Sequence, residues 1–408
     1  MTKTEKLLDR IAQIEATTGI PRTIFAVCPN SPSVVKAAFR AAKRNNAPIY
    51  FAATLNQIDC DGGYTGMTPA EFVKMARIEA ERVNFTGVSI VAIDHGGPWL
   101  KDKQNVEHWS ADQAMDGVKK SFEAAIAAGY DLIHVDPTVD IHLPKGTTID
   151  IHLVVKRTVE LIKHVETFRH AQNLPAISYE VGTEEVHGGL ADETTFDTFL
   201  TELKAGLTAV DLADVWPCFI VGKVGTDLHT TTFDTAVAKE LTAKVRPYGS
   251  YIKGHYTDGV SNPEAYPQCG MGAANVGPEF TMSEYDALAE LEALESKLEV
   301  RNAIAQPSHM TATLKRLVYE SNRWQKWLQA DEKGCDFHAL KAERQTWLVK
   351  TGCRYIWQAP EALVARQRLY DNLSRIGYAP EEVVLGRIER DMDKYFQAFN
   401  LVNLNDLL

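Results

Sequence analysis

Short β-branched runs alternate with stretches of helical period along the first 300 residues, and this alternation constrains the fold more than any other feature. The runs are almost continuously apolar, as expected of strands that are covered on both faces. They span residues 23–28, 49–53, 88–93, 132–135, 177–181, 218–222, 250–253 and 273–276. Eight strand–helix units in about 280 residues match a (β/α)8 barrel. The sequence therefore predicts an α/β protein with a TIM barrel.

Helix signals between the runs support this interpretation. Ser31 and Pro32 suit the N-cap and first position of a helix over 31–46. Ser110 and Gln113 have capping-box spacing at the start of a helix over 110–128. The structural alternative is an open, doubly wound sheet. No GxGxxG motif follows the first run, so nothing favours a dinucleotide-binding fold.

The alternation of strand-like and helical stretches ends near residue 301. Residues 309–408 have helical periodicity throughout and hold four of the seven tryptophans, which we expect to be packing residues. We predict a barrel with an N-terminal helix over residues 1–300 and a helical C-terminal extension over 301–408. The extension is expected to pack on the barrel or to meet another subunit.

Composition excludes several classes of protein. A net charge of -11 does not favour binding to nucleic acid or to an anionic membrane. No apolar run approaches the roughly 18 to 20 residues that span a bilayer, and the N-terminal stretch lacks the apolar region of a signal peptide. Six cysteines without a CxxC pair suit reduced thiols. We expect a cytoplasmic protein.

Acids and histidines gather where the predicted strands end. Asp94 and His95 close the third run, and His229 and His255 follow the sixth and seventh. Strand ends surround one site in a TIM barrel, and three imidazoles make an open site for a divalent transition metal. We predict a metal held by His95, His229 and His255. The alternative is that each histidine is a hydrogen-bonded structural residue; His134, inside the fourth run, suits either role.

Several stretches occur here in the order known from one protein family. They are AATLNQIDCDGGYTGMTPAEFV (52–73), IDHGGP (93–98), IHVDP (133–137), YEVGTEEVHGG (179–189), KGHYTD (253–258), NVGPEFT (275–281) and RYIWQAPEALVARQRLYDNLSRI (354–376). Together they resemble the Z-type family of class II tagatose-bisphosphate aldolase subunits, long labelled tagatose 6-phosphate kinases. The resemblance covers most of the chain and implies a TIM barrel.

The resemblance also implies roles for particular residues. His95, His229 and His255 would hold the divalent ion, usually zinc, with manganese, cobalt or nickel as alternatives. Asp94 would transfer a proton at the C4 hydroxyl of the substrate, and Asn275 would lie near the enediolate. The stretches IDHGGPW and GKVGTDLHTT depart from the family's usual GDHLGP and QPGVEFGDH, which leaves the substrate open.

The chemistry fits a ketose or a ketose phosphate. Retro-aldol cleavage needs a Lewis acid for the enediolate and a carboxylate for the C4 proton. Glu180 or Glu184 is expected to relay protons or to orient a histidine. We expect Asp136, Lys253, Asn275 and Gly259 to bind substrate. Lys253 and the Gly259 amide would bind a phosphate group of the substrate.

Two functions from different classes remain at this point. The first is a metal-dependent enzyme, either a ketohexose 4-epimerase or a tagatose-bisphosphate-type aldolase. The second is a non-catalytic accessory subunit that stabilises a separate aldolase chain. We expect a homo-oligomer, or docking of the aromatic-rich tail to that partner. A kinase is disfavoured because no GxxxxGK[ST] loop is present.

Overall fold

Eight parallel strands close into a barrel at the centre of the chain, as predicted. The computed structural model describes residues 1–144, 147–183, 193–227, 229–301, 304 and 306–408. The strands are β1 (Ile24–Val27), β2 (Ile49–Thr54), β3 (Ser89–Gly96), β4 (Leu132–Val135), β5 (Ser178–Gly182), β6 (Phe219–Val221), β7 (Tyr251–Gly254) and β8 (Ala273–Val276). They pair in sequence order, and β1 closes the barrel against β8.

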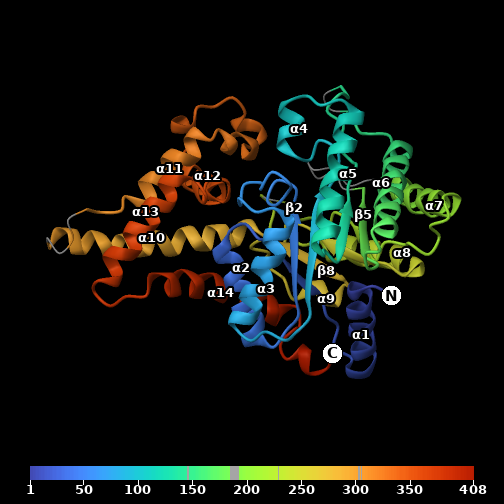
Figure 1. The fold of residues 1–408 in the computed structure, drawn as a ribbon, viewed down its shortest axis with the longest axis horizontal. Helices are drawn as coiled ribbons and strands as arrows, with labels where there is room; N and C mark the ends of the chain where they lie inside the picture. The colour runs from blue at the N-terminus through green and yellow to red at the C-terminus, as the bar shows by residue number, and fades with distance from the viewer. Residues whose placement is uncertain (145–146, 184–192, 228, 302–303, 305) are drawn as a thin grey trace.

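The helices up to α10 alternate with the strands, and most of them lie around the barrel (Figure 1). They are α1 (Lys3–Thr18), α2 (Pro32–Asn45), α3 (Pro69–Arg82), α4 (Asp102–Val106), α5 (Ala111–Ala128), α6 (Ile151–Ala171), α7 (Glu193–Ala209), α8 (Thr235–Val245), α9 (Ala265–Gln268) and α10 (Pro278–Val300). Almost every strand residue is buried, which explains the continuous apolar runs. The predicted Ser110–Gln113 capping box is present at α5.

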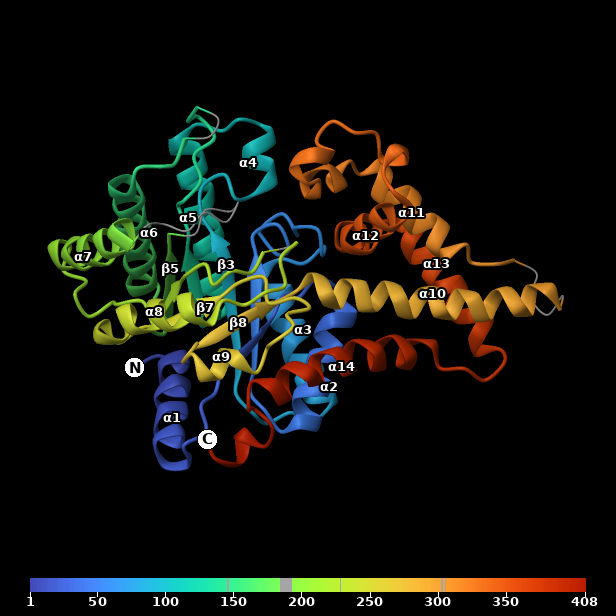
Figure 2. The same ribbon diagram turned by 180° about the vertical axis from the view of Figure 1, so that it is seen from behind.

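Four more helices follow α10, as the C-terminal part of the sequence predicts. They are α11 (Met310–Glu320), α12 (Ala342–Gly352), α13 (Pro360–Ser374) and α14 (Pro380–Ala398). We call residues 306–408 the C-terminal segment. The helix α10 projects from the barrel, α11 to α13 pack on it, and α14 returns to α2 (Figure 2).

Ion pairs and main-chain hydrogen bonds fasten the returning helix to the barrel. Arg40 and Arg44 of α2 pair with Glu389 of α14. The amide of Asn403 donates to the carbonyl of Asn45 at 2.8 Å. The end of the chain therefore lies at the end of the barrel opposite α11 and α12.

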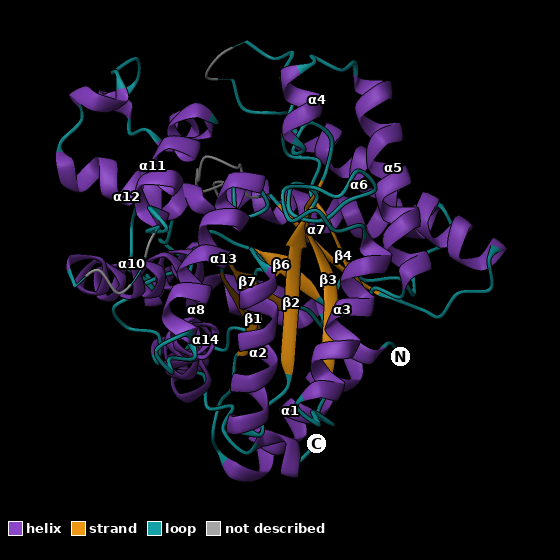
Figure 3. Cartoon of the chain, turned by 60° about the vertical axis from the view of Figure 1, so that its left-hand side comes forward, coloured by secondary structure: helices purple, strands orange, loops and turns teal. Residues whose placement is uncertain are grey.

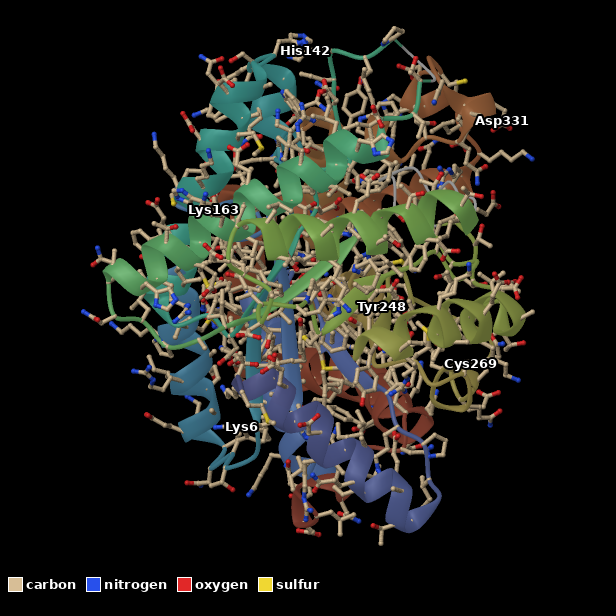
Figure 4. The ribbon with its side chains drawn as sticks, turned by 90° about the vertical axis from the view of Figure 1, so that its right-hand side faces the viewer. Lys6, His142, Lys163, Tyr248, Cys269 and Asp331 are labelled. Carbon is tan, nitrogen blue, oxygen red and sulfur yellow. The ribbon has the colours of Figure 1, made fainter. Side chains whose placement is uncertain are left out.

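The carboxyl ends of the strands face the part of the molecule that carries α4, α11 and α12 (Figure 3). Figure 4 shows His142, in the segment after β4, and Asp331, in the C-terminal segment, at this end, with Lys6 toward the other end. The six cysteines are free thiols, as predicted. In the described part of the chain, no helix has the length and apolarity that crossing a membrane requires.

Candidate active site

A cavity of about 210 Å³ opens at the carboxyl ends of the strands. The barrel contributes strand-end residues, including Asp94, His95, His255 and Asn275. The C-terminal segment contributes the opposite wall through Arg323, Lys326, Trp327, Arg354 and Tyr355. The barrel and the C-terminal segment therefore share one pocket.

Three histidine rings meet at this pocket, and two of them line it. His95 comes from β3, His134 from β4 and His255 from the residue after β7. The ring centroids of His95 and His255 are 4.4 Å apart, and that of His134 lies 5.1 Å and 5.5 Å from them. The Nε2 atom of His134 is buried without a hydrogen-bond partner among the described residues. The histidine that the sequence left open thus belongs to the cluster.

Two buried carboxylates share this cluster with a lysine. The Lys253 ammonium donates to Glu180 at 2.7 Å and 2.9 Å, and to Asp94 at 3.3 Å. The His255 Nε2 atom lies 3.4 Å from Asp94 and 3.3 Å from Glu180. Asn275 donates to both oxygens of Asp94 at 3.0 Å. The polar residues of β3, β5, β7 and β8 therefore form one network inside the barrel mouth.

Neighbouring charges keep this network ionised. Burial opposes ionisation of Asp94, but the positive charges of Lys253 and the nearby histidines outweigh it and hold the pKa of Asp94 well below its usual range. Burial likewise opposes ionisation of Glu180, whose pKa is lowered to about 2 chiefly by Lys253. The two carboxylates in turn raise the pKa of Lys253 against the effect of burial. The lysine is therefore an ammonium at neutral pH.

His95 adopts an unusual backbone conformation. Its φ is +49°, in the left-handed region, and the pairing of β3 with β4 shifts register between Ile93 and Gly96. Strained non-glycine residues of this kind cluster at functional sites. The ring is turned so that its Nδ1 atom lies 2.7 Å from Asp136. The backbone irregularity thus aims His95 at the pocket.

Asp136 fixes the protonation of the His95 ring. Burial opposes ionisation of Asp136, but the bond from His95 outweighs it and lowers the pKa of Asp136. An ionised carboxylate only accepts hydrogen bonds, so Nδ1 of His95 carries the proton. The lone pair of a neutral His95 ring then lies on Nε2. This carboxylate–histidine arrangement is typical of metal-binding histidines.

The donor set suits a divalent cation. One group of possible ligands is Asp94, His134, Glu180 and His255, and another is His95, His134 and Asp136. Carboxylate oxygens and imidazole nitrogens are donors that divalent transition metals accept. The cluster of acids and histidines could therefore hold a metal.

The structure does not bring every predicted site residue to this cluster. His229 is exposed, and its ring lies against Trp347 of α12 at 5.2 Å between centroids. The segment after β6 carries it away from the barrel axis, and His134 takes the third place beside His95 and His255. Glu184 lies outside the described residues.

The predicted substrate-binding residues divide into two groups. Asn275 lines the pocket, and its Oδ1 atom is buried without a partner among the described residues. Lys253 is fully buried and committed to Glu180 and Asp94. The Gly259 amide already donates to Glu279 at 2.8 Å. Lys253 and Gly259 are thus placed as internal supports, because their donors are occupied within the protein. Asp136 is a support as well, because it is buried and bonded to His95.

Sequence reasoning missed several pocket residues. Asn56, Gln57 and Tyr64 line the cavity and belong to the long loop after β2, within the stretch that carries the family resemblance. Gln57 donates to Asn30 at 2.7 Å, and Tyr64 to the same oxygen at 2.9 Å. Their position in the family-like stretch 52–73 was the available signal.

Comparisons with known proteins agree with the geometry. A closed parallel barrel with an acid–histidine cluster at its carboxyl end is a TIM barrel with a candidate site where such barrels carry theirs. The family model described as D-tagatose-1,6-bisphosphate aldolase subunit GatZ/KbaZ-like matches residues 8–395. The chain belongs to this family.

Solved structures share the fold. A protein of Sinorhizobium meliloti 1021, described as a probable tagatose 6 phosphate kinase, is 22% identical with a TM-score of 0.74; the match covers 92% of this chain and all of that one. The fructose-bisphosphate aldolase of Campylobacter jejuni is 11% identical with a TM-score of 0.56, over 99% of this chain and 95% of that one. At these identities the likeness supports the fold.

Proposed function

We propose that this protein is a divalent-metal-dependent enzyme that performs retro-aldol chemistry on a ketose or a ketose phosphate, as a 4-epimerase or an aldolase. The observation that carries the proposal is the cluster of His95, His134 and His255 beside ionised Asp94 at the pocket. His95 and His255 line the cavity and would hold the ion, with His134 as the third imidazole. When bound, the metal would supply Lewis-acid stabilisation of an enediolate.

Asp94 is the proposed proton acceptor. It lines the pocket, it is ionised, and the two bonds from Asn275 fix its orientation. A carboxylate held in this way can take the proton of a substrate hydroxyl as the C3–C4 bond breaks, and can return it when a bond forms again. Glu180 is fully buried and would act through Lys253 and His255.

A Schiff-base mechanism at Lys253 is disfavoured on physical grounds. The nucleophile in such a mechanism is a neutral amine that reaches the substrate carbonyl. Lys253 is fully buried, and its raised pKa keeps it protonated. The ammonium instead orients the two carboxylates.

The accessory-subunit function is the second candidate, because the family to which the chain belongs is named for an aldolase subunit. A protein that only stabilises a partner would not need metal or an ionised Asp94 for its role. Metal binding and turnover by the isolated chain therefore separate the two candidates.

The test is the content of divalent metal per chain, measured by elemental analysis after incubation with zinc or manganese. We expect about one ion in the wild type and in the control variant His229→Ala, and a large loss in His95→Ala and His255→Ala. Asp94→Asn should keep the metal and lose turnover of fructose, tagatose or their phosphates. A wild-type chain that binds no metal would refute the enzyme proposal and favour the accessory role.

A further inference from the structure

Arg354 is a nearly buried cation on the wall of the pocket opposite the histidines. It belongs to the 3₁₀ turn Cys353–Tyr355 that follows α12, and its exposed fraction is 5%. Its guanidinium carbon lies 4.6 Å from the ring centroid of Trp327 and 4.9 Å from that of Tyr355. Arg354, Trp327 and Tyr355 all line the cavity. Aromatic rings of this kind hold the guanidinium plane in place.

Arg354 differs from the other cations of the pocket in having no acidic partner. Arg323 and Lys326 both pair with Asp102. No carboxylate of the described residues forms an ion pair or a hydrogen bond with Arg354. A buried charge without a counter-ion is costly. An anion that enters the pocket would supply the missing partner.

The neighbouring acid Asp258 is engaged elsewhere. Its carboxylate accepts hydrogen bonds from the amides of Gly277, at 2.9 Å, and Glu279, at 2.8 Å, at the start of α10. Burial, together with the charge of Glu279, raises the pKa of Asp258 to about 7. Asp258 thus caps α10, and its charge favours that of Arg354 without a direct ion pair between them.

We propose that Arg354 binds an anionic group, a carboxylate or a phosphate, at one end of the ligand in this pocket. The planar fork of an arginine matches the oxygens of either group and pairs with them in a bidentate manner. This inference rests on the proposed function, in that it deepens the class of ketose substrate: one end of the sugar carries a negative charge. The C-terminal segment then selects the substrate, while the barrel carries the histidines and Asp94.

The test measures binding of small anions to the full chain by calorimetry, without turnover. The probes are inorganic phosphate, D-glycerate as a carboxylate, and glycerol as a neutral control. The variants are Arg354→Gln and Arg354→Lys. The matched control is Lys326→Gln, which removes a cation of the same pocket that is paired with Asp102. We expect Arg354→Gln to weaken anion binding about 10- to 100-fold, Arg354→Lys to retain part of it, and Lys326→Gln to change it little.

Each outcome decides the proposal. Anion binding that is unchanged in a folded Arg354→Gln protein, or absent from the wild type, overturns it. Preference for phosphate or for glycerate identifies the anionic group. If the Arg354 variants do not fold, a crystal structure of the wild type with the bound anion decides: an anion on Arg354 supports the proposal, and one elsewhere refutes it. The binding is measured on metal-free protein, so that the readout is independent of metal and turnover and failure here leaves the metal test of the proposed function standing.

Discussion

Replacement of Lys253 by methionine tests whether the buried ammonium stabilises the carboxylate network. The change keeps most of the side-chain volume but removes the partner of Glu180 and Asp94, whose side chains are 0% and 4% exposed. Breaking a buried ion pair by removing one partner costs about 3–5 kcal/mol. We expect a loss of this size in the free energy of unfolding at pH 7, measured in metal-free protein with EDTA.

Protonation of Glu180 limits the loss and makes it depend on pH. In the wild type the pKa of Glu180 lies at about 2, so its stabilising effect is present above the unfolded pKa and fades as the pH falls toward 2. Without Lys253 the folded protein can bind a proton on Glu180. At pH 7, protonation of Glu180 costs about 1.4 kcal/mol for each of the roughly 2.7 pH units above an unfolded pKa of about 4.3, or about 4 kcal/mol in total. At pH 5 the same cost is about 1 kcal/mol.

The assay is urea unfolding followed by circular dichroism at pH 5 and pH 7. The double variant Lys253→Met/Glu180→Gln should recover much of the lost stability at pH 7, because it removes one unpaired charge. Lys36→Met is the control, since Lys36 pairs with Glu381 on the surface and should cost less than about 1 kcal/mol. A loss below about 1 kcal/mol in Lys253→Met, or one that does not change with pH, would refute the reasoning.

Three further changes probe the supports of the site. Asp136→Asn removes the ionised acceptor of His95, so competition with a chelator should show metal affinity lowered about 10- to 100-fold. Because the pKa of Asp258 is raised to about 7, the wild type should lose stability as the pH rises from about 4 to about 7. The free energy of unfolding of Asp258→Asn, measured in urea, should not fall in this way over the same pH range. Gly97→Ala would place a Cβ atom 1.7 Å from the Asp136 carbonyl oxygen, so thermal unfolding should show a loss of about 1–3 kcal/mol.

The fold could be predicted from the sequence because its signals are local. Continuous apolar runs mark strands covered on both faces, and residues such as Ser110 and Gln113 mark where helices begin. All eight strands lie where these runs predict them. The helical character of residues 309–408 was predictable for the same reason.

The site was less predictable because it depends on how side chains turn after a strand ends. His95 and His255 stand at or next to strand ends and meet, but the segment after β6 takes His229 outward. His134 had a signal in its own strand: it lies between Ile133 and Val135 and is the register partner of Glu180. Successive side chains of a strand point to opposite faces. A polar residue in an otherwise apolar barrel strand can therefore face the barrel interior, where a site residue would lie.

Arg354 begins the family-like stretch 354–376, but its place in the pocket could not be predicted from the sequence, because that place depends on tertiary docking. No local pattern shows that a turn more than 250 residues after the third strand forms the opposite wall of the pocket. That wall forms only when α10 to α13 pack together.

The shared pocket has a consequence for biosynthesis. Chains emerge from the ribosome with the N-terminal part first, and domains generally fold as they appear. The strands and the three clustered histidines are all translated before residue 280, whereas Arg354 and Tyr355 emerge about 80 residues later, or roughly 4–16 s at typical elongation rates. The nascent barrel therefore spends this interval with its mouth uncovered and its charged interior open to solvent and to ions. A metal could enter before the opposite wall is in place.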